Sequence, residues 1–175
     1  MRSGFPYRVW QFWISFRGKL EPGFLDDVDG LLSPDQLELF FQLPVSDQNH
    51  SYRVYRCLIQ EGETNRDLLQ AALLHDLGKV KFPLKSWERA AAVLMIGVFP
   101  GLANRWAAGE PKGIRKSLVV YHNHPEWGAA LADKAGCSPL TVWLVRNHES
   151  LRPRFFPNEE AGELLRKLQN ADNQN

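Results

Sequence analysis

The chain has 175 residues, the length of one typical domain and enough to bury a single hydrophobic core. Hydrophobic residues make up 44% of it and charged residues 23%, which excludes a disordered tail, a collagen-like fibre and a coiled coil. With 21 Lys and Arg against 20 Asp and Glu, the net charge of +1 gives no indication of a nucleic-acid-binding protein.

The N-terminal segment places aromatic side chains between basic ones. The run Val9 to Phe16 is flanked by four Arg and Lys residues. It is shorter than the roughly 18 apolar residues of a transmembrane helix, and no small-residue cleavage site follows it. We expect residues 1–32 to form an aromatic and basic extension that packs on the domain. An arm that docks on a membrane surface or on a partner is the alternative.

Helix start signals recur along the rest of the chain, whereas strand signals are scarce. Apolar residues at helical spacing predict helices over about 33–43, 47–60, 64–77, 85–108 with a break at Pro100, 114–121, 124–136, 138–148 and 159–172. No period of 20 to 50 residues repeats, and no Gly/Ser-rich linker divides the chain. The sequence therefore predicts one all-helical domain.

Three residues are expected to set helix boundaries. Ser33 begins a capping box, in which a serine and a glutamine three residues later bond to each other's backbone. Gly78 is expected to end the helix over 64–77. Pro125 is expected at the first position of a new helix, where proline is tolerated.

The two cysteines favour a reducing compartment and exclude a metal site built on a Cys-x-x-Cys pair. Cys57 and Cys137 are too few for a disulfide framework and form no Cys-x-x-Cys pair. A reducing environment follows, and we expect a cytoplasmic protein.

Several polar side chains lie on helix faces whose other residues are apolar and are therefore expected to be buried. They are His50, His75, Asp76, His124 or His122, His148 and Asp172. An ionised carboxylate that is buried without a partner costs several kcal/mol, about 2–7 even for an uncharged polar group, so two of them near several imidazoles need a common cation. Nitrogen and oxygen ligands without thiolate favour Fe, Mn, Zn, Co, Ni or Mg. Six ligands exceed the needs of one tetrahedral ion, which favours two ions.

The ordered motifs resemble those of the HD superfamily. His50 is followed by His75-Asp76-Leu77-Gly78-Lys79 and then by the distant Ala171-Asp172, similar to the family's H…HD…D signature. The resemblance implies a compact bundle of about six to eight helices over residues 33–175 and a divalent-metal site. Its core ligands would be His50, His75, Asp76 and Asp172, with Asp76 between two ions.

A second pair of motifs is similar to the HD-GYP branch of that superfamily. His124-Pro125-Glu126-Trp127-Gly128-Ala129 and Asn147-His148-Glu149 resemble its HP..GA and HHE elements, which implies that His124 and His148 hold the second ion. Asn147 replaces a histidine, and the segment 155–157 (Phe-Phe-Pro) stands where that branch has Gly-Tyr-Pro. These departures argue against cyclic di-GMP hydrolysis. His122 remains an alternative ligand or a substrate contact.

The chemistry expected of such a site is phosphoester hydrolysis by a metal-activated hydroxide. Asp76 and Lys79 are the catalytic candidates, and Lys79, Arg146 and His122 are the candidates for substrate binding. Eight basic residues against two acidic ones lie between Lys79 and Lys116, a local charge of +6. They would form either a mouth that attracts a small phosphorylated compound such as a nucleotide, or an ordinary solvated face.

Two other functions use the same residues. Four histidines and two aspartates also resemble the ligand set of HD-type mixed-valent di-iron oxygenases, which cleave carbon–carbon or carbon–phosphorus bonds. A non-catalytic module that binds a nucleotide or a partner is the third possibility. We expect no specific nucleic-acid binding and no transmembrane segment, and the sequence does not determine the oligomeric state.

Overall fold

A computed structural model describes residues 20, 23–150, 153 and 157–175, and these residues form an all-helical fold. They contain nine α-helices, eight of them seven residues or longer, and no strand, which confirms the expected class. In chain order they are α2 (Phe24–Val28), α3 (Pro34–Phe40), α4 (Val45–Gln60), α5 (Arg66–Leu74), α6 (Ser86–Val98), α7 (Pro100–Ala107), α8 (Lys116–Lys134), α9 (Pro139–Asn147) and α10 (Glu159–Asn173). Two 3₁₀ helices, η1 (Leu77–Lys81) and η2 (Gly113–Arg115), connect them.

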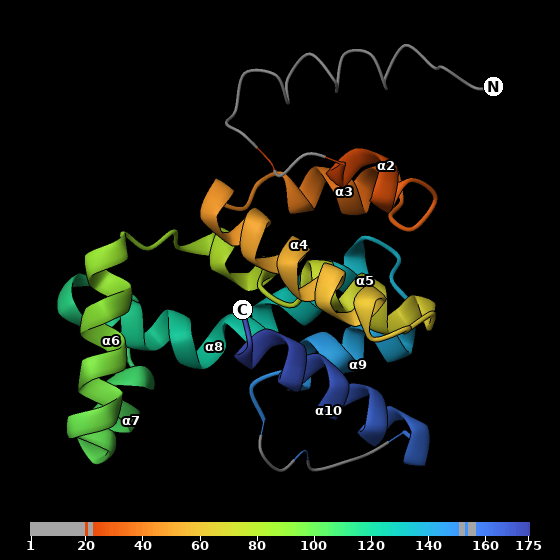
Figure 1. The fold of residues 1–175 in the computed structure, drawn as a ribbon. Helices are drawn as coiled ribbons and strands as arrows, with labels where there is room; N and C mark the ends of the chain where they lie inside the picture. Colours follow the sequence, from red (N-terminus) through yellow and green to blue (C-terminus); the bar gives the residue numbers. More distant parts are fainter. Residues whose placement is uncertain (1–19, 21–22, 151–152, 154–156) are drawn as a thin grey trace.

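One large core holds most of the helices together. Helix α4 packs against α5, α5 against α9, and α10 against all three, while α8 packs against α9 and η1 (Figure 1). Phe24, Val28 and Leu32 are buried in this core, so α2 packs on the domain. The aromatic run at 9–16 lies outside the described residues.

Several helices begin with a side chain that caps the backbone, and the capping box predicted at Ser33 is confirmed. Ser33 and Gln36 form the capping box at the start of α3. Ser138 caps α9 through the backbone N–H of Thr141, and Asn158 caps α10 in the same way through Ala161. These caps satisfy N–H groups that a helix leaves without an internal partner.

The predicted role of Gly78 is wrong. Helix α5 ends at Leu74, and Gly78 lies inside η1 without a positive φ angle. A Cβ atom on Gly78 would lie 1.9 Å from the carbonyl oxygen of His124 and 2.8 Å from the backbone nitrogen of Gly128. Glycine is therefore required because η1 crosses α8 at backbone contact.

The predicted helix start at Pro125 is also wrong. Helix α8 runs without interruption from Lys116 to Lys134, with Pro125 inside it. Proline has no N–H to donate to the carbonyl oxygen four residues earlier, that of Tyr121. The side chain of His124 supplies the missing donor, with its Nδ1 2.9 Å from that oxygen. In the described part of the chain no helix is long and apolar enough to cross a membrane.

Candidate metal centre

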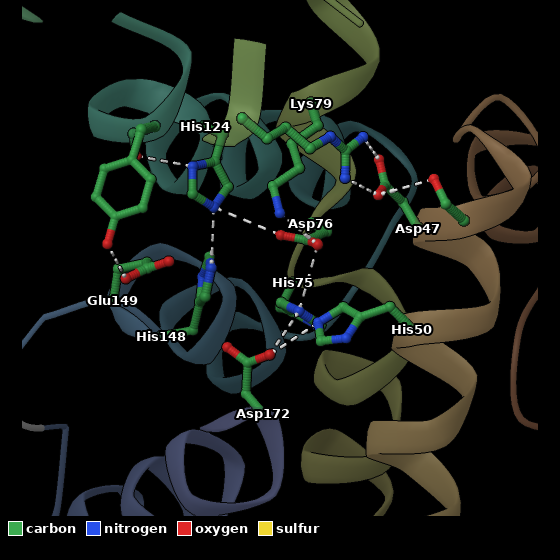
Figure 2. A network of polar contacts seen from close by, with 12 residues as sticks. Asp47, His50, His75, Asp76, Lys79, His124, His148, Glu149 and Asp172 are labelled. Carbon is green, nitrogen blue, oxygen red and sulfur yellow. Dashed lines mark hydrogen bonds and ion pairs between the residues drawn. The ribbon is translucent and has the colours of Figure 1, made fainter. Parts of the chain in front are cut away.

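The structure brings together the six residues expected as ligands (Figure 2). His50 comes from α4, His75 and Asp76 from the turn after α5, His124 from α8, His148 from the end of α9 and Asp172 from α10. His75, Asp76, His124 and His148 are buried, and His50 and Asp172 are partly buried. Five helical segments that are far apart in sequence thus converge on one point.

Asp76 lies between two groups of possible ligands. One group is His50, His75 and Asp76, and the other is Asp76, His124 and His148. Within each group the ligand atoms lie within 4.8 Å of one another. Asp76 Oδ2 is 3.6 Å from His75 Nε2, and Asp76 Oδ1 is 3.5 Å from His124 Nε2. Each oxygen of one carboxylate therefore faces a different group.

The three buried histidines are oriented in the same way. Their Nδ1 atoms lie 2.9, 2.9 and 2.7 Å from the carbonyl oxygens of Ala72, Tyr121 and Val145, each three residues earlier in the chain. A carbonyl oxygen only accepts hydrogen bonds, so Nδ1 carries the proton in each ring. The Nε2 atom of each ring is therefore the one that can bind a metal ion, in the form of the ring that carries no proton there.

The Nε2 atoms of these three rings lack suitable hydrogen-bond partners among the described residues. Those of His124 and His148 lie 3.1 Å apart. Burial lowers the pKa of His124 to about 4 and that of His148 to about 3, so both are neutral at pH 7 and two lone pairs face each other. His75 Nε2 has no hydrogen-bond partner among the described residues. A shared cation would satisfy all three atoms, so these residues fit a metal ion.

Asp172 completes the first group. Its Oδ1 is 2.9 Å from His50 Nε2 and 3.5 Å from His75 Nε2. Burial would raise the pKa of Asp172, but the hydrogen bond from His50 and the nearby charge of His75 outweigh burial and lower it. Burial likewise opposes ionisation of Asp76, yet the charges of His75 and Lys79 hold its pKa well below the usual value. Both carboxylates are therefore ionised at neutral pH.

Lys79 lies beside the ligands, whereas the other two substrate candidates do not. Lys79 Nζ donates to Asp76 Oδ2 at 2.6 Å, and its side chain is partly exposed. Arg146 is on the surface and pairs with Glu126 at 2.9 Å. His122 is exposed and lies two residues before His124, about 200° around the same helix, so it points away from the cluster.

Several of the eight basic residues between 79 and 116, which we expected to form a basic mouth or a solvated face, have local partners. Arg89 pairs with both oxygens of Asp47, Lys116 with Glu88 and Lys112 with Glu110. Arg115 lies over the ring of Trp106. Of these eight residues, Lys79 is the one with a hydrogen bond to the ligand cluster, through Asp76. The charge count was correct, but it did not reveal that most of these cations have local partners.

Three residues that we did not select from the sequence lie at or near the site. Glu149 faces the cluster: burial raises its pKa, and so do the charges of Asp172 and Asp76. Tyr121 Oη lies 3.5 Å from Glu149 Oε2. Asp47 is buried and holds Arg89. A signal existed for two of them, because Asp47 and Tyr121 precede the ligands His50 and His124 by three residues on the same helix face.

The site as a whole is two overlapping groups of imidazole and carboxylate donors that could hold metal ions. The donors suit a borderline or hard divalent ion, and the groups share one carboxylate. Comparisons of the chain with models of protein families, with curated proteins and with solved structures found no match.

Proposed function

We propose that this chain is a metal-dependent phosphohydrolase of the HD type, acting on a small phosphorylated compound such as a nucleotide. The observation that carries the proposal is the position of Asp76, whose two carboxylate oxygens face two separate sets of histidines at 3.5 and 3.6 Å. A carboxylate in that position suits a pair of divalent ions. The motif resemblance in the sequence agrees with this arrangement.

Each ligand has a role in the proposal. His50, His75, Asp76 and Asp172 hold one ion, and Asp76, His124 and His148 hold the other. The carbonyl oxygens that accept from Nδ1 keep each buried ring in the orientation that presents Nε2. A bound pair of divalent ions supplies positive charge for the phosphate and lowers the pKa of water toward about 7.

Lys79 binds the substrate in this proposal. Within the described residues, its ammonium group is the one Lys or Arg group that contacts the cluster. It donates a hydrogen bond to Asp76. Burial lowers the pKa of Lys79, but Asp76 outweighs that effect and raises it, so the group stays charged. A phosphate that approaches the ions would meet this charge at the edge of the site.

In this proposal Glu149 and Tyr121 interact with the leaving group. Burial and the charges of Asp172 and Asp76 raise the pKa of Glu149, which favours its protonated form more than in an exposed glutamate. Tyr121 lies beside it and is exposed. In this proposal Glu149 donates a proton to the oxygen that leaves the phosphorus.

The test is a reaction panel on anaerobically purified protein reconstituted with Mn²⁺, Fe²⁺, Co²⁺ or Zn²⁺. Phosphomonoesters, phosphodiesters and nucleotides are assayed for phosphate or product release, and oxygen uptake is measured in parallel. Hydrolysis that requires metal and is lost in His148→Ala supports the proposal. Oxygen uptake with a mixed-valent di-iron EPR signal, and no hydrolysis, would assign the same ligands to an oxygenase. Metal binding with neither reaction would support a non-catalytic binding module.

A further inference from the structure

Exposed apolar side chains are concentrated in one part of the described chain. Of its nine exposed large hydrophobic residues, eight lie between residues 87 and 121. Six belong to the hairpin formed by α6 and α7, which lies at the left edge of the molecule in Figure 1: Trp87, Val93, Leu94, Val98, Phe99 and Leu102. Concentrated apolar exposure of this kind marks an interaction surface.

The exposed side chains are not needed to hold the hairpin together. Its inner face has a small core of its own, built from Ala92, Ala103, Ala107 and Leu118. Val93, Leu94, Val98 and Phe99 point outward with 57% to 66% of their surface exposed. We call residues 93–102 the tip of the hairpin, because α6 ends and α7 begins within it.

The tip has no charged side chain of its own, and the nearest charged residue on each side of it is an arginine. Between residues 89 and 109 the only charged side chains are Arg89, four residues before the tip, and Arg105, three residues after it. Arg89 is fixed to α4 by Asp47, and Arg105 is exposed. Toward the base of the hairpin, Glu88 pairs with Lys116. The tip is thus apolar, and each of its two helices carries an arginine just beyond it. This arrangement is complementary to a membrane that has an apolar interior and anionic headgroups.

The length of the tip matches the depth of such a surface. Val98 follows Val93 by five positions on α6, which corresponds to about 7.5 Å along the helix. Helices that lie in the plane of a membrane interface bury their apolar face by about 5–10 Å, so a tip of this length reaches the same depth when the hairpin axis points into the membrane. A second copy of the chain is a poorer occupant, because it would place arginines beside arginines without offering a carboxylate from the tip.

We propose that the tip of the α6–α7 hairpin inserts into the headgroup region of an anionic lipid membrane, with Arg105 at the level of the phosphates. The hairpin packs on α8, whose residue Leu118 belongs to the small core of the hairpin. The proposal does not depend on the metal centre, because none of the six ligands lies in the hairpin.

Vesicle flotation of the full chain tests this proposal. Vesicles of phosphatidylcholine alone are compared with vesicles of phosphatidylcholine and phosphatidylglycerol. We expect binding to the anionic vesicles. Phe99→Glu should weaken it at least about tenfold, since it removes one large apolar side chain from the membrane. Arg105→Glu should weaken it about fivefold or more on anionic vesicles only, the effect expected for a basic residue near the surface.

The matched control is Ile59→Glu, which changes an exposed hydrophobic residue of α4 outside the hairpin and should bind as the unmodified chain does. All three positions are exposed, so each variant should keep the melting temperature of the unmodified chain. Absence of vesicle binding would overturn the proposal, as would binding that Phe99→Glu leaves unchanged. Light scattering that shows a dimer, broken by Phe99→Glu, together with no vesicle binding, would identify a second copy as the occupant.

Discussion

The imidazole Nδ1 of His124 lies 2.9 Å from the carbonyl oxygen of Tyr121, in the place where residue 125 would donate a backbone hydrogen bond if it were not proline. Pro125 therefore leaves an acceptor inside α8 that the neighbouring histidine uses. This contact fixes the proton on Nδ1 and presents Nε2 to His148 and Asp76. Pro125, which disfavours a helix interior, thus helps to orient His124 as a ligand.

Replacing Pro125 by alanine should raise the free energy of unfolding of the chain and weaken its metal binding. Alanine is favoured over proline inside a helix by about 3 kcal/mol, more than the roughly 1–2 kcal/mol lost with the buried ring. The new N–H should compete with His124 for the Tyr121 carbonyl, which weakens metal affinity by about tenfold or more. Thermal unfolding and metal titration measure the two effects. An unchanged affinity would show that the His124 contact does not orient the ligand.

Removing the metal should destabilise the fold. Ligands from α4, α5, α8, α9 and α10 meet at the site, so a bound ion stabilises only the folded chain. At a free metal concentration of 100 times Kd, the stabilisation is about 2.7 kcal/mol. Melting curves before and after chelation measure it. Identical curves for the metal-loaded and chelated protein would contradict the assignment.

Metal affinity should rise with pH. Burial lowers the pKa of His75, but Asp76 and Asp172 outweigh this effect and raise it to about 9. Below pH 9 an ion must displace a proton from His75, so affinity should rise about tenfold per pH unit from 7 to 9 and level off above. Calorimetric titration in buffers of different ionisation enthalpy detects the released proton. An affinity that is constant from pH 7 to 9 would argue against His75 as a ligand.

Replacing Lys79 by alanine should reduce catalysis without removing the metal. Lys79 competes with an ion for Asp76 Oδ2, so metal content should be equal or higher in the variant. Loss of its charge should lower kcat/KM for a phosphoester by about 10- to 100-fold. The matched control is Lys81→Ala, since Lys81 belongs to the same 3₁₀ helix but is exposed and lies over Trp127. Equal kcat/KM for the two variants would remove Lys79 from the proposed site.

Gly78→Ala should destabilise the chain strongly. The new methyl group would overlap the backbone of α8 at His124, at a cost of about 3 kcal/mol or more. Gly97→Ala is the control, because no atom lies within 4 Å of its added methyl group and alanine favours a helix by about 1 kcal/mol. Denaturant unfolding should therefore shift in opposite directions for the two variants. A Gly78→Ala chain as stable as the unmodified one would contradict the close contact of η1 with α8.

The sequence predicted the helices and the six clustered residues because both follow from local patterns. His50 and His148 share helix faces with apolar residues, and the structure buries those faces. The roles of Gly78 and Pro125 could not be predicted in this way. Each depends on a contact across the fold or on a side chain that replaces a backbone donor, and their positions alone match ordinary helix ends.

The charged residues were predicted least well. The local excess of Lys and Arg between 79 and 116 is real, but pairing with Asp47, Glu88 and Glu110 depends on tertiary contacts. Glu149 was not selected although it follows His148 directly. Its position at the cluster depends on where α9 ends relative to α10, which residue spacing does not determine.

Elemental analysis of the full chain purified anaerobically, beside its Asp76→Asn variant, tests the shared role of Asp76 most directly. Asparagine keeps the shape of the side chain but removes the charge that faces both groups of histidines. Asp133→Asn, an exposed position of α8, serves as the control. We predict about two divalent ions per chain in the unmodified protein and in the control. The Asp76→Asn variant should lose both, and full metal content in that variant would contradict the account.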